Sequence, residues 1–307
     1  MDFGHYNELS FYPEEMFMLL GSIFVLSLAA AVGLCLLGGR FGGLQFLWML
    51  PLGFACCFLV LLVVAFLFLL LLCAFVDPSK PREKDSPFYR AVAGQYIHLL
   101  MVLLRVRVHT EGLEKTPKEG RFLLVSNHLH EADPAVMLRF FPKSQLAFVA
   151  KKEAGTMFVV GKIMPMLLCQ LINRENDRDA LRTIVRCIQI LREDKASVAI
   201  FPEGSIHDDR KFYPLKPGVF KIALKANVPI VVCSLRNTNH IIKNALRLRP
   251  TDVHLHLLEV IPAEALAGKN TVEIAHYVHD LIASDLGPEN CAPIPEENTG
   301  FHTPSPL

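Results

Sequence analysis

Residues 122–134 read FLLVSNHLHEADP, and the order of apolar and polar residues here indicates how the whole domain is built. The four apolar residues from Phe122 to Val125 are typical of a short buried strand. Asp133 and Pro134 then form a helix-start signal, an acidic N-cap with proline at the first helical position. The stretch therefore predicts a strand that leads through a short turn into a helix, with His128 in the turn.

Short strands alternate with helices along the sequence around this stretch. We expect strands at residues 105–110, 122–126, 145–150, 168–173, 197–201, 230–235 and 253–260. We expect helices at residues 134–141, 178–192, 218–226 and 271–286. The alternation predicts an α/β layered domain, with a mixed sheet flanked by helices. Ligands of such domains bind at the carboxyl ends of the strands.

His128 and Asp133 follow the strand expected at 122–126, in an H-x-x-x-x-D pattern. Asp133 can accept a hydrogen bond from one ring nitrogen, which leaves the other nitrogen basic enough to take a proton from a hydroxyl group. Each residue also has a structural alternative. Asp133 can cap the following helix, and His128 can be a core histidine bonded to the backbone.

The strand at 197–201 leads into a second motif, Phe201-Pro202-Glu203-Gly204-Ser205. The glycine lets a ligand approach the backbone, and Glu203 can hold a hydroxyl group of a polyol. A surface turn is the structural alternative. Cations near other predicted strand ends suit a phosphate ester, because each can bond phosphate oxygens. These cations are Lys151, Lys152, Arg174, Arg178 and Lys216.

The first quarter of the chain is far more apolar than the rest. Residues 16–39 and 41–76 hold no charged side chain, and each stretch exceeds the roughly 20 residues that span a bilayer. We expect two transmembrane helices in residues 16–76, with a reversal at the glycine-rich residues 38–43. Buried soluble helices are the alternative, which the absence of a polar face in residues 58–75 disfavours.

Basic residues indicate the orientation of these spans. Lys80, Arg82, Lys84 and Arg90 follow the second span, and Lys and Arg gather on the cytosolic side of a membrane. We therefore expect an integral membrane protein whose catalytic domain and N-terminal residues 1–15 lie on the cytosolic face. Residues 77–104 hold a polar linker and an amphipathic helix, which either lies on the membrane surface or packs on the domain core.

Net charge and cysteine content exclude several classes of function. The formal net charge is +1, and no basic stripe with interleaved aromatic residues indicates nucleic-acid binding. The eight cysteines form no C-x-x-C pair, so neither a zinc site nor a disulfide framework is predicted. We expect no bound cofactor or metal. The tail at 287–307, rich in Pro, Glu and Asn, is expected to be disordered.

Together these motifs resemble the 1-acylglycerol-3-phosphate acyltransferase (lysophosphatidic acid acyltransferase) family of the glycerolipid acyltransferase superfamily. The resemblance runs from Val106 to Leu235 and keeps the order of the family's motifs. It places an acyltransferase domain at residues 105–286. The matching blocks are Glu111-Gly112-Leu113-Glu114, Ser126-Asn127-His128 through Asp133, Ala150-Lys151-Lys152-Glu153 with Gly161, Ile172-Asn173-Arg174, Phe201-Pro202-Glu203-Gly204-Ser205, Leu215-Lys216-Pro217-Gly218 and Val228-Pro229-Ile230-Val231.

The resemblance implies transfer of an acyl group from a thioester of coenzyme A or acyl carrier protein to the free hydroxyl of a lysophospholipid. The implied acceptor is 1-acyl-sn-glycerol-3-phosphate and the product phosphatidic acid. His128 would be the general base and Asp133 would hold its tautomer. The implied partners are membrane lipids, the lysophospholipid and acyl carrier protein. The implied substrate-binding residues are Arg174 for the phosphate, Glu203, Gly204 and Ser205 for the glycerol end, and Lys152 and Lys216 for additional charge.

The sequence departs from the family pattern in the third block, which usually reads Glu-Gly-Thr-Arg. Here Ser205 stands in place of the threonine and Ile206 in place of the arginine. Either Arg210 supplies the missing cation from nearby, or the acceptor carries a different head group. A catalytically inactive lipid-binding protein that keeps the fold is a further alternative.

Overall fold

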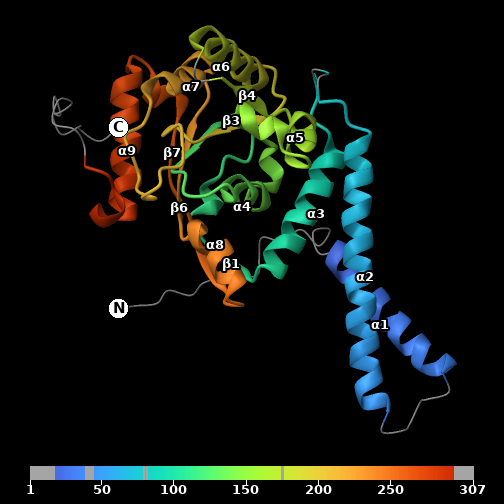
Figure 1. The fold of residues 1–307 in the computed structure, drawn as a ribbon. Helices are drawn as coiled ribbons and strands as arrows, with labels where there is room; N and C mark the ends of the chain where they lie inside the picture. Colours follow the sequence, from blue (N-terminus) through green and yellow to red (C-terminus); the bar gives the residue numbers. More distant parts are fainter. Residues whose placement is uncertain (1–17, 39–44, 79, 81, 174–175, 294–307) are drawn as a thin grey trace.

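The computed structural model of the chain describes residues 18–38, 45–78, 80, 82–173 and 176–293 (Figure 1). Within these residues the strands form one seven-stranded sheet in the order β1-β7-β6-β2-β5-β3-β4. Neighbouring strands from β6 to β4 are parallel, β7 runs antiparallel to β6, and β1 is parallel to β7. The predicted mixed sheet is confirmed. Its strands are β1 Val106–Glu111, β2 Leu123–Ser126, β3 Leu146–Lys151, β4 Gln170–Ile172, β5 Ser197–Ile200, β6 Ile230–Arg236 and β7 Thr251–Ile261.

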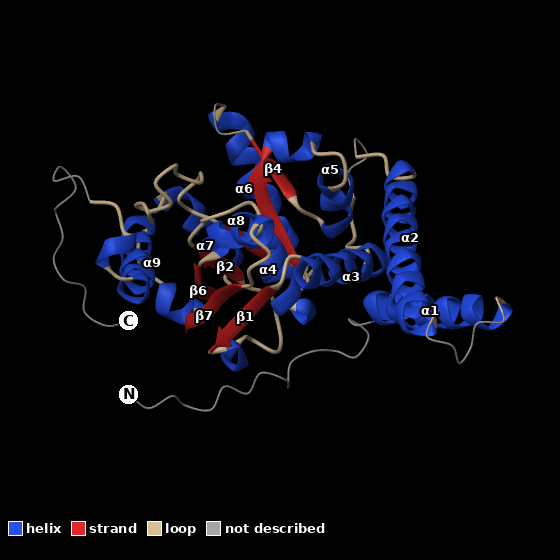
Figure 2. Ribbon diagram, turned by 60° about the horizontal axis from the view of Figure 1, so that its bottom comes forward, coloured by secondary structure: helices blue, strands red, loops and turns tan. Residues whose placement is uncertain are grey.

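Helices cover both faces of the sheet, which gives the layered architecture expected from the sequence (Figure 2). Side chains of β2 alternate between the two faces, because successive residues of a strand point in opposite directions. Leu123 and Val125 pack with α6, α7 and α9, while Leu124 packs with α3, α4 and α8. The bounds are α3 Pro87–Leu103, α4 Asp133–Phe140, α6 Asp177–Arg192, α7 Lys221–Ala226, α8 Ile241–Leu246 and α9 Thr271–Leu286.

The structure differs from the expected elements where segments are short. The strand expected at 168–173 begins only at Gln170, because Leu168 has a left-handed backbone (φ 58°) that ends a 3-10 turn. The helix expected at 218–226 opens with a 3-10 turn at Pro217–Phe220. Helices α5 (Val160–Ile163) and α8 were not predicted, since four and six residues are too few to display a helical period.

Two helices in the described residues are long and apolar enough to cross a membrane, α1 (Met18–Leu37) and α2 (Phe46–Ala74). They pack against each other through Phe24 and Phe54, whose rings meet edge to face at 5.2 Å. Much of their remaining apolar surface is exposed, and both helices lie to one side of the sheet domain (Figures 1 and 2). Such surface needs a lipid environment, which indicates membrane association. The reversal predicted at 38–43 lies largely outside the described residues.

Helix α3 packs on the domain and also contacts α2. Ser86 caps its first turn by accepting a hydrogen bond from the amide of Tyr89. The hydroxyls of Tyr89 and Tyr96 donate to the carbonyls of Leu72 and Ala65 in α2. The helix therefore joins the apolar pair to the sheet domain. Its predicted position on the membrane surface stays a prediction.

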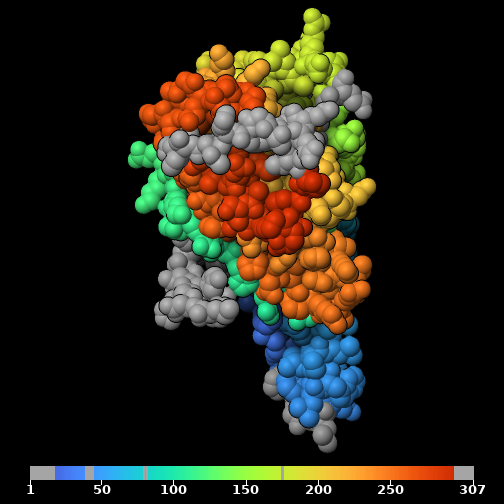
Figure 3. Space-filling view, turned by 90° about the vertical axis from the view of Figure 1, so that its left-hand side faces the viewer, coloured from blue at the N-terminus to red at the C-terminus, as the bar shows by residue number. Residues whose placement is uncertain are grey.

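The segment 287–293 is ordered against the domain, so the prediction of a disordered tail from residue 287 is wrong for these residues. The amide of Phe212 donates to the carbonyl of Asn290 at 2.8 Å, and the amide of Ala292 donates to the carbonyl of Phe212 at 2.9 Å. Ala292 and Phe212 are both buried. Figure 3 looks onto this face, where the red C-terminal residues lie against α9. Residues 294–307 lie outside the described residues.

We predict that a chain ending after Gly287 is less stable than a chain ending after Pro293. The shorter chain loses two backbone hydrogen bonds and the burial of Ala292, together about 1–3 kcal/mol, which lowers the unfolding midpoint by several degrees. Thermal unfolding in detergent measures the difference. Equal midpoints for the two truncated chains would show that the segment contributes nothing to the domain.

Candidate active site

His128 and Asp133 meet in the turn between β2 and α4. The Nδ1 atom of His128 lies 2.8 Å from Oδ2 of Asp133. The same oxygen accepts hydrogen bonds from the backbone amides of Leu129 at 2.7 Å and His130 at 2.9 Å. Asp133 is fully buried. A buried carboxylate requires such partners, because an unpaired charge away from water is costly.

The helix-cap alternative for Asp133 is not what the structure contains. The N-cap position of α4 is Ala132, which has no side chain that could cap, and Asp133 is the first helical residue. Its carboxylate turns back toward the preceding turn. With Nδ1 donating to Asp133, the neutral ring of His128 carries its proton there, and Nε2 is the basic atom.

Phe201 holds the other side of the His128 ring. The two rings stack with centroids 4.1 Å apart and planes 11° from parallel. Phe201 follows β5, the strand next to β2, so the contact depends on the pairing of these two strands. The imidazole keeps 18% of its side-chain surface exposed. Sequence reasoning quoted Phe201 only as part of the second motif and gave it no role.

Asn127 ties the end of β2 to β6. Its amide nitrogen donates to the carbonyl of Leu235 at 2.9 Å, and its carbonyl oxygen accepts from the amide of Leu235 at 2.7 Å. The side chain is fully buried. Asn127 thus continues the parallel ladder past the last strand residue and sets the point where the chain turns toward His128. The sequence shows that a strand of buried type is followed by Asn127. It does not show that the side chain of Asn127 bonds to β6.

Glu203 joins the two predicted motifs through main-chain hydrogen bonds. Its Oε1 accepts from the amide of His128 at 2.7 Å, and its Oε2 accepts from the amide of Tyr213 at 2.9 Å. The residue is 5% exposed. Burial raises the pKa of Glu203 to about 8, against the opposing effect of these two amides. Its expected contact with an acceptor hydroxyl stays a prediction.

Gly204, Ser205 and Lys216 gather at the turn after Glu203. Gly204 has φ 92°, and a Cβ atom there would lie 2.6 Å from Nζ of Lys216. The positive φ favours glycine at this position, and the Lys216 side chain lies in the space beside it. The amide of Lys216 donates to the carbonyl of Pro202, which closes the loop, and Ser205 is exposed.

Arg210 is a third connection between the loops. Its backbone is left-handed at φ 56°, and its Nη1 donates to the carbonyl of Leu129 at 2.6 Å. The guanidinium group therefore lies beside the turn that contains His128, although Ile206 occupies the expected arginine position.

Lys152 and Arg174 complete the predicted site residues. Lys152 is exposed and opens the 3-10 turn at Lys152–Thr156, directly after the carboxyl end of β3. Arg174 lies outside the described residues, so its phosphate contact stays a prediction. Among the described residues, no group of three or more His, Cys, Asp or Glu side chains is placed to hold a metal ion.

The chemistry available at this edge of the sheet follows from the geometry. A partly exposed imidazole is oriented by a buried carboxylate and a ring stack, with its basic nitrogen away from that carboxylate. Such a group can accept a proton from a nearby hydroxyl. In the described residues, no serine or cysteine hydrogen-bonds to the His128 ring in the manner of an activated nucleophile.

A model of the family described as Acyltransferase matches residues 107–236. The chain is 25% identical over 232 residues to the 1-acyl-sn-glycerol-3-phosphate acyltransferase of Limnanthes alba, covering 75% of this chain and 80% of that one. It is 26% identical over 242 residues to the enzyme of that name from Cocos nucifera, covering 78% and 76%.

A solved structure shares the fold. The crystal structure of the 1-acyl-sn-glycerophosphate (LPA) acyltransferase PlsC from Thermotoga maritima superposes with a TM-score of 0.55 at 23% identity. The likeness covers 71% of this chain and 86% of that one. With the matching family model and the two plant relatives, the sequence motifs and the fold agree: residues 107–236 match the acyltransferase family, and the chain is an O-acyltransferase.

Proposed function

We propose that the enzyme transfers a fatty acyl group from a thioester to the free hydroxyl of 1-acyl-sn-glycerol-3-phosphate, which gives phosphatidic acid. The observation that carries the proposal is the hydrogen bond between His128 and buried Asp133 at the carboxyl edge of the sheet. The names of the plant relatives support the acceptor. The acyl donor is a thioester of coenzyme A or of acyl carrier protein.

In the proposed reaction, Nε2 of His128 takes the proton of the acceptor hydroxyl as its oxygen attacks the thioester carbonyl carbon. The carbon–sulfur bond then breaks, and the proton passes from His128 to the leaving thiolate. Asp133 stabilises the imidazolium that forms in between, because its carboxylate lies 2.8 Å from Nδ1. The oxygen displaces the thiolate directly, so no acyl-enzyme forms.

Cations beside the loop support a phosphate-bearing acceptor. Arg210 and Lys216 belong to the segment that follows Glu203, and both have charged groups next to motif residues. In our proposal, Arg210 supplies the charge that Ile206 lacks, together with Arg174 and Lys152. The second candidate is an acceptor with another head group, which the missing arginine at position 206 favours.

Glu203 acts in this proposal chiefly as a positioning residue. Both of its oxygens bind backbone amides, one in each motif loop. It therefore sets the distance between the turn of His128 and the loop that holds Gly204 and Ser205, where the glycerol end of the acceptor would bind. The basic residues after α2 support a cytosolic position for this edge.

Replacing His128 by Ala is expected to reduce acyl transfer to lysophosphatidic acid by at least about 10³-fold, because the base is lost. Asp133→Asn should reduce it strongly as well, since the amide favours the wrong tautomer. His240→Ala, at an exposed histidine outside the motif, is the matched control. Activity of the His128 variant near that of the control would rule out His128 as the base. No acyl transfer by the wild type or the control would favour an inactive lipid-binding protein.

Replacing Arg210 by Ala is expected to raise the Michaelis constant for lysophosphatidic acid by roughly 10-fold or more, in line with a lost charged hydrogen bond. Arg210→Lys should retain part of the affinity. Lys211→Ala, which removes the same charge from the neighbouring residue, is the control. A panel of lysolipid acceptors separates the two candidate functions. If Arg210→Ala raises the Michaelis constant equally for acceptors without a phosphomonoester, Arg210 does not bind the phosphate.

The raised pKa of Glu203 predicts a pH-dependent contribution to stability. Between the ordinary pKa of 4.5 and the folded value of about 8, the folded protein keeps a proton that the unfolded chain has lost. This contribution to stability therefore falls as pH rises through that window. Glu203→Gln cannot ionise, so its unfolding midpoint should rise relative to wild type across the window.

The control for this measurement is Glu119→Gln at an exposed position. Its difference from wild type should be the same at every pH in the window. If the difference between Glu203→Gln and wild type is equally flat, the carboxyl group of Glu203 titrates normally in the folded protein.

A further inference from the structure

Two large apolar side chains stand exposed on a loop outside the site described above. Met157 is 51% exposed and Phe158 is 70% exposed. They lie between the 3-10 turn Lys152–Thr156 and helix α5. Val160, at the start of α5, is also exposed. Adjacent exposed side chains of this kind mark a surface that binds an apolar partner.

The loop is built to present these side chains. The amide of Gly161 donates to the carbonyl of Met157 at 2.8 Å, and the hydroxyl of Thr156 donates to the carbonyl of Glu153 at 2.8 Å. A Cβ atom on Gly161 would collide with the carbonyl of Gly155, so the two glycines allow the loop to fold closely on itself. A closely folded loop leaves Met157 and Phe158 at its exposed tip.

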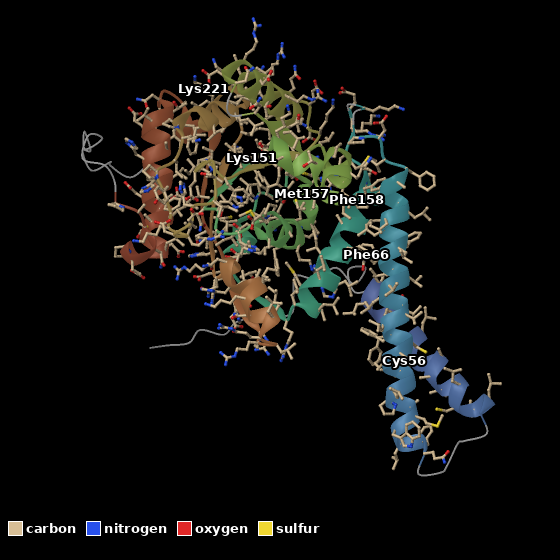
Figure 4. All side chains as sticks on the ribbon, viewed as in Figure 1. Cys56, Phe66, Lys151, Met157, Phe158 and Lys221 are labelled. Carbon is tan, nitrogen blue, oxygen red and sulfur yellow. The ribbon has the colours of Figure 1, made fainter. Side chains whose placement is uncertain are left out.

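The loop is attached beside the end of α2. Nζ of Lys162 donates to the carbonyl of Val76 at 3.0 Å, and the amide of Ser86 donates to the carbonyl of Met166 at 2.9 Å. Figure 4 shows Met157 and Phe158 next to the upper half of α2, above the level of Phe66. In this part of α2, Phe66 and Leu71 are exposed, and so is Phe75 at its C-cap. The apolar surface of the loop is therefore at the level of lipid-facing helix surface.

Cations border the apolar tip. Lys151 and Lys152 precede the loop and are exposed. The Lys151 ammonium lies 3.8 Å from the carboxylate of Glu153, a solvated pair that contributes little by itself. Apolar and aromatic side chains flanked by lysines are typical of segments that lie in the membrane interface.

We propose that the Met157–Phe158 loop inserts into the bilayer surface beside α2 and forms a second membrane contact of the sheet domain. The partner is the lipid bilayer: the tip contacts the upper acyl chains, and Lys151 contacts lipid phosphates. Continuity with the exposed apolar face of α2 favours lipid over a protein partner, because lipid that surrounds Leu71 and Phe75 also reaches the loop.

This contact orients the active site. The loop follows the carboxyl end of β3, and β3 is parallel to β5 and β2 in the same sheet. The carboxyl ends of these strands carry Lys151, Phe201 and His128. Insertion of the loop therefore turns the edge that contains His128 toward the membrane. The inference concerns membrane contact and does not depend on which acyl acceptor the enzyme uses.

Depth-resolved tryptophan quenching tests the proposal on the full chain. The chain has one tryptophan, Trp48, so Trp48→Phe gives a background free of tryptophan. Phe158→Trp and, separately, Met157→Trp are introduced and reconstituted into phosphatidylcholine vesicles with brominated acyl chains. We expect bromine to quench each emission by about half or more and aqueous iodide to quench it weakly, as for interfacial side chains.

Val272→Trp is the matched control, because Val272 is also exposed and apolar but lies in the first turn of α9, which is on the opposite side of the domain from α2 in Figure 1. Its emission should respond to iodide and not to brominated lipid. Emission from positions 157 and 158 that matches this control would overturn the proposal. Emission shielded from both quenchers would overturn it as well, because a protein surface would then cover the loop.

Discussion

The hydrogen bonds to one oxygen of Asp133 are the interaction on which the site depends. Oδ2 accepts from the ring of His128 and from the amides of Leu129 and His130. All three donors lie within five residues of the carboxylate, so the charge that orients the imidazole also folds the turn that carries it. Loss of the carboxylate would leave three partly buried donors without their acceptor, and the ring would no longer be oriented. Structure and proposed catalysis therefore share one group.

A second buried carboxyl group, that of Glu203, has different hydrogen-bond partners from Asp133. Its two oxygens bind amides from two separate loops, whereas the bonds to Asp133 come from one turn. With only neutral amide partners, burial dominates and its pKa rises to about 8. Arg210 crosses between the same two loops by donating to Leu129. The loop after β5 is thus held to the turn after β2 by one carboxyl group and one guanidinium group.

The local sequence pattern was sufficient to predict where the strands and the long helices lie, because the apolar alternation and the start signals are within each element. Helix α9 was predicted with its observed bounds, 271–286. The sequence pattern did not predict the structure at positions where contacts with residues far away in the sequence determine it. The bridge between Phe212 and Cys291 orders a tail whose composition indicates disorder, and the stack of Phe201 on His128 requires β2 and β5 to be neighbours. The motif residues were identified from sequence, but the main-chain bonds of Glu203 were not.

The parallel part of the sheet connects the proposed chemistry to the membrane. Strands β2, β5 and β3 end at one edge of the sheet. They are followed by His128, by Phe201, which stacks on its ring, and by the Met157–Phe158 loop. Because the strands are hydrogen-bonded in a fixed register, the depth at which that loop meets lipid also determines the height of Nε2 above the acyl chains. A lysophospholipid keeps its chain in the bilayer and its hydroxyl at the surface. A base held at that height can reach the hydroxyl while the lipid remains in the membrane.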